Sequence, residues 1–143
     1  MLVNKFLKEA DEWVGTPRMD GQCKKQVGCD CVGLLIGVAK EIGYLPGDYK
    51  EPNYYQTARG DSLVKILEKH LKLTDRTKDS FIVGDIVVIE YGNQLTHVGI
   101  IYSENLIIHS HRKMGVVKVN VDQALKRKIK KVFELWDKLP LLR

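Results

Sequence analysis

Residues 27–38 read VGCDCVGLLIGV, so a turn rich in Gly and Asp leads directly into a long apolar run. The apolar run predicts a helix, and Cys31 stands at its start. The first turn of a helix leaves backbone N–H groups unpaired and carries the positive end of the helix dipole, and both stabilise a thiolate. Cys31 is therefore the first candidate nucleophile, and we expect its thiol to be reactive.

Two segments that contain histidine lie far downstream of this cysteine. His97 begins the segment HVGI, and His109 and His111 lie in the segment IIHSH at residues 107–111. If an odd-length turn centred on Glu104 joins two strands here, position 97 lies opposite 111 and diagonal to 109, so the three histidines share one face. An even-length turn would separate them. A cysteine with histidines distant in sequence is what thiol-based acyl transfer needs.

The order of the predicted elements indicates the fold class. Apolar residues at helical intervals predict helices over residues 3–14, 32–42 and 62–71, the last with Asp61 as its cap. Period-two and β-branched patterns predict strands over residues 86–91, 96–102, 106–111, 116–121 and 129–136, with a helical turn at 122–128 and loops at 18–30 and 45–57. Helices first and strands second predict an α+β fold with an antiparallel sheet.

Length and composition fit one ordinary globular domain. The chain has 143 residues, of which 44% are hydrophobic and 29% are charged, which is enough for a single core. We therefore expect one domain over residues 1–143. No stretch approaches the ~20 apolar residues of a membrane span, so no membrane insertion is expected.

The charge and the N-terminus bear on partners and location. The formal net charge of +5 favours a polyanionic partner, which leaves nucleic acid, an anionic cell wall and an anionic membrane surface open. Charged residues interrupt the apolar ones over residues 1–12, unlike the unbroken apolar region of a signal peptide. We expect synthesis in the cytoplasm, with another export route for any action outside the cell.

Three cysteines and one isolated histidine need separate interpretations. The spacing of Cys29 and Cys31 strains a disulfide between them, so reduced thiols are expected. Cys23 and Cys29 are interpreted as structural or incidental thiols. His70, on the third predicted helix, has no evident partner and is expected to be solvated.

An ordered set of motifs carries a resemblance to a known family. The motifs are WVGTP at 13–17, GCDCVGL at 28–34, GDIV at 84–87, HVGI at 97–100 and Ile108-His109. Together they resemble the NlpC-type cysteine peptidases of bacterial cell walls, particularly the small phage-tail subgroup, over residues 6–136. The resemblance implies a papain-like α+β fold, with N-terminal helices packed on a C-terminal antiparallel sheet. It also implies hydrolysis of peptide-stem amides in peptidoglycan, typically next to a D-glutamyl or diaminopimelyl residue.

Matching the motifs position by position implies a role for each residue. Cys31 becomes the nucleophile, His97 the base and His109 the residue that orients the base. The family commonly has an aromatic residue, often tyrosine, directly after the Gly-Thr-Pro turn, where this chain has Arg18. A cation there could stabilise a tetrahedral oxyanion or bind an anionic stem carboxylate. Asp30 is a further candidate for this substrate or oxyanion site.

The functional hypothesis is a cysteine endopeptidase that works through an acyl-enzyme, needs no cofactor and no metal, and acts on a peptidoglycan stem peptide. In the phage-tail interpretation its other partners are tail proteins and its location is the virion tail; no nucleic-acid partner is expected. Two alternatives stay open. One is a non-catalytic basic module that binds cell wall or nucleic acid. The other is a zinc-binding module that uses Cys23, Cys29, Cys31 and a histidine, although no Cys-x2-Cys pair exists.

Overall fold

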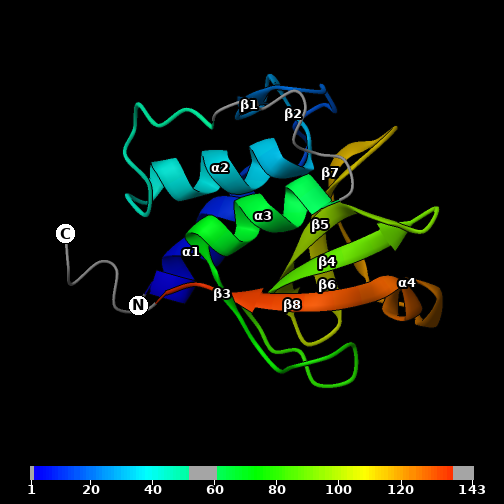
Figure 1. Ribbon diagram of the computed structural model, residues 1–143. Coiled ribbons are helices and arrows are strands. Elements are labelled where there is room, and N and C mark those ends of the chain that lie inside the picture. The colour runs from blue at the N-terminus through cyan, green and yellow to red at the C-terminus, as the bar shows by residue number, and fades with distance from the viewer. Residues whose placement is uncertain (1, 52–60, 137–143) are drawn as a thin grey trace.

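Helices and sheet follow one another along the chain much as the sequence predicts. The computed structural model describes residues 2–51 and 61–136. Helices α1 (Leu2–Glu12), α2 (Cys31–Glu41) and α3 (Asp61–His70) lie together on one side of the sheet (Figure 1). The predicted α+β class, with N-terminal helices packed on an antiparallel sheet, is confirmed.

One antiparallel sheet carries the second half of the chain. Its strands lie in the order β3-β8-β4-β5-β6-β7. Their bounds are β3 (Lys72–Leu73), β4 (Ile86–Tyr91), β5 (Gln94–Ser103), β6 (Leu106–His111), β7 (Gly115–Asn120) and β8 (Ile129–Glu134), and α4 (Gln123–Lys128) precedes β8. The hairpin between β4 and β5 turns at Gly92 and Asn93, both with positive φ, as the Gly-Asn signal predicts.

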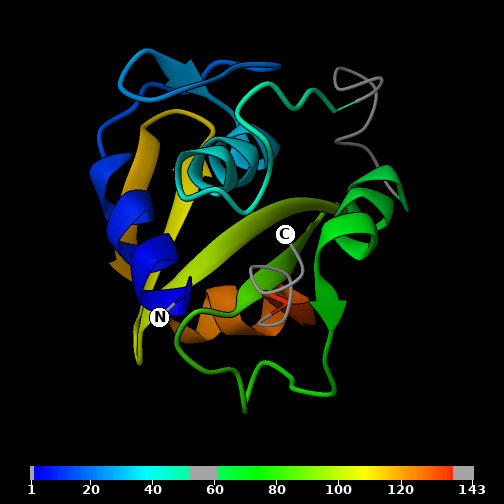
Figure 2. The same ribbon diagram turned by 90° about the vertical axis from the view of Figure 1, so that its left-hand side faces the viewer.

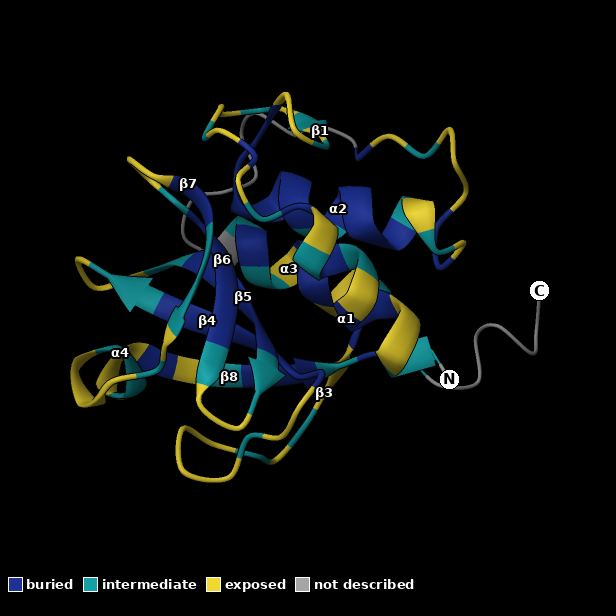
Figure 3. Cartoon of the chain, turned by 180° about the vertical axis from the view of Figure 1, so that it is seen from behind, coloured by how far each residue is buried: buried dark blue, intermediate teal, exposed yellow. Residues whose placement is uncertain are grey.

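The sheet is buried on both faces. On the helix side, the core includes Val88, Val98, Ile100 and Ile108. On the opposite side, the alternate residues form a second cluster with β8, namely Val87, Ile89, Ile101, Ile107, Ile129 and Val132. Dark blue runs through α2 and along the middle of β4 and β5 in Figure 3, whereas α4 is mostly yellow. The period-two alternation of a strand therefore separates two apolar layers, which explains why β4 reads as a continuous apolar run.

Helix α2 occupies the centre of the helical layer. Figure 2 looks along α2, with α1 on one side of it and α3 on the other. The buried Trp13 ring packs directly on Gly37, where any Cβ would run into the ring. Even this apolar helix has only 11 residues, and no helix in the described part of the chain is long and apolar enough to cross a bilayer.

The predicted boundaries differ from the structure in a few places. The predicted loop at 18–30 contains a two-stranded ribbon of β1 (Cys23–Lys24) and β2 (Gly28–Cys29), and β3 was also not predicted. Strands of two residues show no periodicity, so the sequence pattern misses them. Helix α3 begins at Asp61 itself, α1 ends two residues early, and β8 ends at Glu134. The last part of the predicted 45–57 loop lies outside the described residues.

The contact between Trp13 and Gly37 gives a stability prediction. Gly37→Ala should lower the free energy of unfolding by about 1–3 kcal/mol, because the added methyl group overpacks the interface by more than the gain in helix propensity. Gly47→Ala is the matched control, since no atom lies within 4 Å of its Cβ position. Urea unfolding of both variants measures the difference. Equal stability of the two would mean that the ring can move aside.

Candidate active site

The start of α2 is fixed by the Asp30 carboxylate. Its Oδ1 accepts a hydrogen bond from the Gly33 N–H at 2.7 Å, which caps the helix, and its Oδ2 accepts one from the Gly21 N–H at 2.7 Å. An ionised carboxylate only accepts hydrogen bonds, so it cannot stabilise an oxyanion. Asp30 is therefore a capping and positioning residue. The predicted oxyanion role for Asp30 does not fit this chemistry, whereas its predicted substrate role stays a prediction.

Cys31 lies at the first position of α2 and is 2% exposed. Its Sγ is 3.8 Å from the carbonyl oxygen of Thr96, the residue before His97, and the thiol donates to that oxygen. Burial raises the pKa of Cys31 to about 11, the charge of Asp30 adds to this, and Arg18 acts in the opposite direction. The expected thiolate is therefore wrong for the free protein, because desolvation outweighs the helix terminus.

The histidine strands pair in the register that the sequence analysis required. Ile100 lies opposite Ile108, and the same register continued sets position 97 opposite 111. The turn itself is even-length, however, since Ser103 pairs with Leu106. A register shift between Ile101 and Ser103 restores the alignment. The turn is thus the even-length alternative, but a β-bulge gives the register that the odd-length turn would have given.

His97 and His109 form a buried pair on β5 and β6. The Nε2 atom of His97 lies 2.8 Å from the Nδ1 atom of His109. Each of the two residues is 5% exposed. Gly99 allows this approach, because a Cβ there would clash with the side chain of Ile107 and come within 3.4 Å of the Cβ of His109. Close packing of β5 against the side chains of β6 therefore explains why the HVGI motif has glycine at this position.

Both imidazoles are held in the neutral form. Burial lowers the pKa of His97 to about 3, and the positive charges of His109 and Arg18 add to the effect. Burial likewise lowers the pKa of His109 to about 4, with His111 and Arg18 contributing. A neutral imidazole has one N–H and one acceptor nitrogen, so one ring of the pair donates and the other accepts. The pair can therefore hold one imidazole in a fixed tautomer.

Arg18 and Ser110 connect the segment before Cys31 to β6, the strand that contains His109. Arg18 donates from Nη1 to the Ser110 carbonyl at 2.8 Å and from Nε to Asp20 at 3.2 Å. The Ser110 hydroxyl donates to the Cys29 carbonyl at 3.0 Å. Ser110 of β6 is thus joined both to Arg18, on the loop after α1, and to Cys29, on β2.

The remaining predicted residues take local roles. The ring of His111 accepts from the N–H groups of Lys113 and Met114, which shapes the turn between β6 and β7. Val32, the residue after Cys31, is buried in the core. Burial raises the pKa of Cys29 to about 12. Among the residues that the structure describes, no group of three or more His, Cys, Asp or Glu side chains could hold a metal ion.

The sequence analysis missed Tyr91 and Arg112. The ring centroids of Tyr91 and His97 are 5.4 Å apart, and the Arg112 guanidinium lies over the Tyr91 ring at 6.0 Å. Tyr91 stands directly before the hairpin turn and Arg112 directly after His111. Neither residue belongs to a motif. Their positions next to the turn and next to His111 were therefore the only indication in the sequence that they lie near the site.

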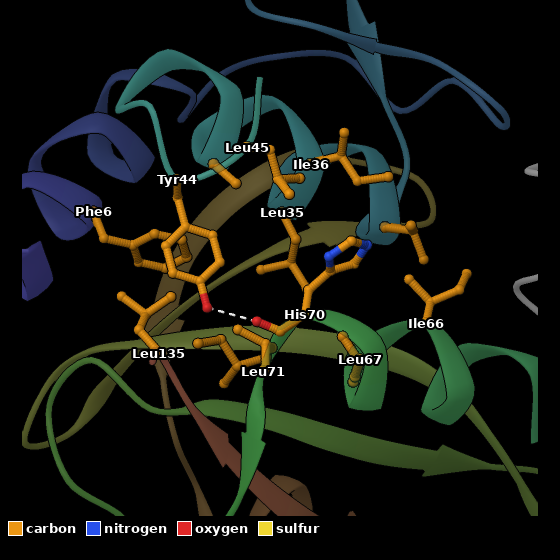
Figure 4. Close-up of a pocket in the computed structure, with 13 residues that line it drawn as sticks. Phe6, Leu35, Ile36, Tyr44, Leu45, Ile66, Leu67, His70, Leu71 and Leu135 are labelled. Carbon is orange, nitrogen blue, oxygen red and sulfur yellow. Dashed lines mark hydrogen bonds between the residues drawn. The ribbon is translucent and has the colours of Figure 1, made fainter. Parts of the chain in front are cut away.

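His70 lies away from this site and is not simply solvated. Its Nε2 is 2.9 Å from the hydroxyl of Tyr49 and 3.4 Å from Glu51, and its carbonyl accepts from Tyr44 at 2.5 Å. The expectation of a solvated histidine is therefore wrong, since the polar partners come from a loop remote in sequence. Figure 4 shows His70 beside an apolar cavity of about 40 Å³, which none of the candidate catalytic residues lines.

Comparison with known families assigns the chain. The model of the NlpC/P60 family matches residues 13–133, a span that contains Cys31, His97 and His109. The chain belongs to the NlpC/P60 family. The family resemblance inferred from the motifs is thereby confirmed, whereas the phage-tail subgroup is not shown. Comparison with curated proteins returned no match.

Solved structures share the fold at low sequence identity. The NlpC/p60 domain of the peptidoglycan hydrolase SagA is 18% identical, with a TM-score of 0.58 over 93% of this chain and 98% of that one. The P60 domain of a Mycobacterium avium subspecies paratuberculosis antigen is 15% identical, with a TM-score of 0.58 over 93% of both chains. At these identities the comparison shows that the chains share one fold.

A longer relative shows the same fold in part of its length. An NlpC/P60 family protein from Bacillus cereus is 15% identical, with a TM-score of 0.63 over 91% of this chain. The match covers only 39% of that protein, and a match to an NLP/P60 family protein from Staphylococcus aureus covers 41%. The chain therefore spans about two fifths of the length of these two relatives.

The buried histidine pair gives a titration prediction. The imidazole NMR shifts of His97 and His109, assigned with His97→Gln and His109→Gln variants, should stay constant from about pH 8 to about pH 5, because burial disfavours the charged rings. Unfolded histidines take up protons near pH 6.5, so the fold should lose stability as the pH falls below that value. A titration midpoint near 6.5 for either buried ring would contradict this.

Proposed function

We propose that this protein is a cysteine endopeptidase that hydrolyses amide bonds in the stem peptides of peptidoglycan. The buried hydrogen bond between His97 and His109, next to the carbonyl that holds the Cys31 thiol, carries the proposal. Support for the substrate comes from neighbours of the same fold. SagA is described as a peptidoglycan hydrolase, and Ly7917 has been solved with the hydrolysing product of MDP.

The proposed role of His97 as the base determines which tautomer it must have. For His97 to accept the Cys31 proton at Nδ1, its Nε2 must carry the hydrogen and donate to Nδ1 of His109. His109 thus orients the base and fixes its tautomer. The neutral state of both rings keeps the accepting lone pair available over a wide pH range.

The reaction then proceeds in two halves. As His97 removes the thiol proton, the Cys31 sulfur bonds to the amide carbon and forms a tetrahedral oxyanion. The C–N bond breaks while the His97 imidazolium returns the proton to the leaving amine, which leaves a thioester. A low pKa makes that imidazolium a strong acid, which favours protonation of the amine. Water, deprotonated by the same base, hydrolyses the thioester.

The start of α2 stabilises the negative charge that forms. Because the buried thiol is neutral, it must ionise during the attack. The negative charge is first on the Cys31 sulfur and then on the oxygen of the amide carbonyl. Backbone hydrogen bonds from Val32 and Val98 lower the pKa of Cys31 and so favour the anionic sulfur. Preorganised N–H groups at a helix start are also placed to stabilise an oxyanion.

The setting of this activity is a further part of the proposal. The resemblance to the phage-tail subgroup, together with the net charge of +5, supports a wall hydrolase that reaches its anionic substrate as a component of a phage tail. Its partners are then other tail proteins, and synthesis is cytoplasmic. Mass spectrometry of purified virions tests this, since absence of the chain from the particle would contradict it.

Variants of the three residues test the catalytic roles. Cys31→Ala should abolish release of stem fragments from purified peptidoglycan, and His97→Ala should reduce it by about 10²–10⁴-fold, because no other group accepts the proton. His109→Ala should reduce it by less, since water can replace part of the orienting bond. Mass spectrometry of the new termini measures the rate and identifies the bond.

Two substitutions serve as controls. Cys23→Ala removes a half-buried thiol and His111→Ala a turn residue, and both should keep most of the activity. If the folded wild-type protein binds peptidoglycan without cleaving any stem peptide, the chain is a non-catalytic wall-binding module instead. Equal losses in His111→Ala and His97→Ala would show that the roles of the histidines are wrongly assigned.

A further inference from the structure

The surface has a hollow of about 390 Å³ whose lining includes Arg18, Asp20 and Arg112. Arg18 and Asp20 belong to the loop between α1 and β1, while Arg112 belongs to the turn between β6 and β7. Segments far apart in sequence thus bring two guanidinium groups to one hollow. Of these three side chains, two are cationic and one is anionic, so the trio carries a net positive charge.

Arg18 is anchored and already faces a carboxylate. Its Nη1 is held by the Ser110 carbonyl at 2.8 Å, and its side chain is only 19% exposed. Its Nε contacts Asp20 at 3.2 Å, and the side chain of Asp20 is 88% exposed. An exposed ion pair of this kind contributes little to stability, so a carboxylate from a ligand can replace Asp20 at small cost.

Arg112 lines the same hollow from the turn between β6 and β7, next to His111. Its guanidinium lies 6.0 Å from the centroid of the Tyr91 ring, which is in turn 5.4 Å from the His97 ring. One aromatic ring therefore separates Arg112 from the proposed base. In the part of the chain that the structure describes, no acidic side chain forms an ion pair with Arg112. Both arginines also help to lower the pKa of His97, which agrees with their place beside it.

We propose that Arg18 and Arg112 together bind a free carboxylate of the peptide, next to the amide that is cleaved. This proposal rests on the proposed peptidase function and names the substrate chemistry of the same site. A guanidinium presents several N–H donors in a fixed plane and keeps its charge at any working pH, which suits a carboxylate. In a peptidoglycan stem, this group comes from a D-glutamyl residue or from a diaminopimelyl residue.

Kinetics on matched synthetic stem peptides test the proposal. One peptide has both carboxylates free, the second has the D-glutamyl carboxylate amidated, and the third has the diaminopimelyl carboxylate amidated. For the protein without substitutions, one amidation should raise KM about ten- to hundredfold, the range expected for loss of a hydrogen bond to a charged group. Arg112→Gln should raise KM for the free peptide by a similar factor and leave kcat nearly unchanged. One of the two amidated peptides should show the raised KM, and we call its change the critical amidation. For that peptide, Arg112→Gln should leave KM unchanged.

Lys113→Gln is the matched control, because Lys113 is the exposed neighbour of Arg112 and loses the same charge. Its KM should not change. Equal effects of Arg112→Gln and Lys113→Gln would indicate general electrostatic attraction and overturn the proposal. A fall in kcat in Arg18→Gln, by about 10²-fold with KM unchanged, would assign Arg18 to the oxyanion and also overturn it. Melting temperatures confirm that the variants fold.

A binding measurement separates this proposal from the peptidase function. Cys31→Ala protein should bind the free peptide more tightly than the critical amidated one by calorimetry, and Arg112→Gln in that background should remove the difference. If the protein without substitutions cleaves the peptides but its Cys31→Ala form binds all three equally, the carboxylate site is wrong and the function stands. If the carboxylate preference is present without any cleavage, the peptidase function is wrong and the binding site stands.

Discussion

The two hydrogen bonds of the Asp30 carboxylate determine where Cys31, the proposed nucleophile, lies. One caps α2 at Gly33 and the other holds the preceding loop at Gly21, so Cys31 is fixed from both sides. The same carboxylate raises the pKa of the neighbouring thiol. A residue that is necessary for geometry therefore opposes ionisation of the thiol, so in the proposed mechanism His97 on β5 must remove the proton.

Burial is the second constraint, and it favours the neutral form of Cys31, His97 and His109. It raises the pKa of Cys31 and lowers those of His97 and His109, so thiol and imidazoles are all neutral in the free protein. Charge then appears only during the reaction, where the donors at the start of α2 and the proton on His97 can stabilise or neutralise it.

Sequence patterns worked well where an element is long and poorly where geometry depends on one residue. The apolar periods of α2 and β4 predict these elements almost to the residue, because each buries a continuous face or both faces in the core. The ribbon of β1 and β2 is too short to have a period. Turn length alone could not decide the register of β5 with β6, because a bulge near Tyr102 compensates for the even turn.

The sequence by itself determined the fold class, the family and the identity of the cysteine and the two histidines, because these depend on residue type, spacing and order along the chain. Only the tertiary structure decided their ionisation, since desolvation depends on how completely the helices and sheet enclose each group. It also decided the capping role of Asp30, the partners of His70 and the approach of Arg18 and Arg112 to one hollow. These contacts join segments remote in sequence, and no local pattern records the distance between them.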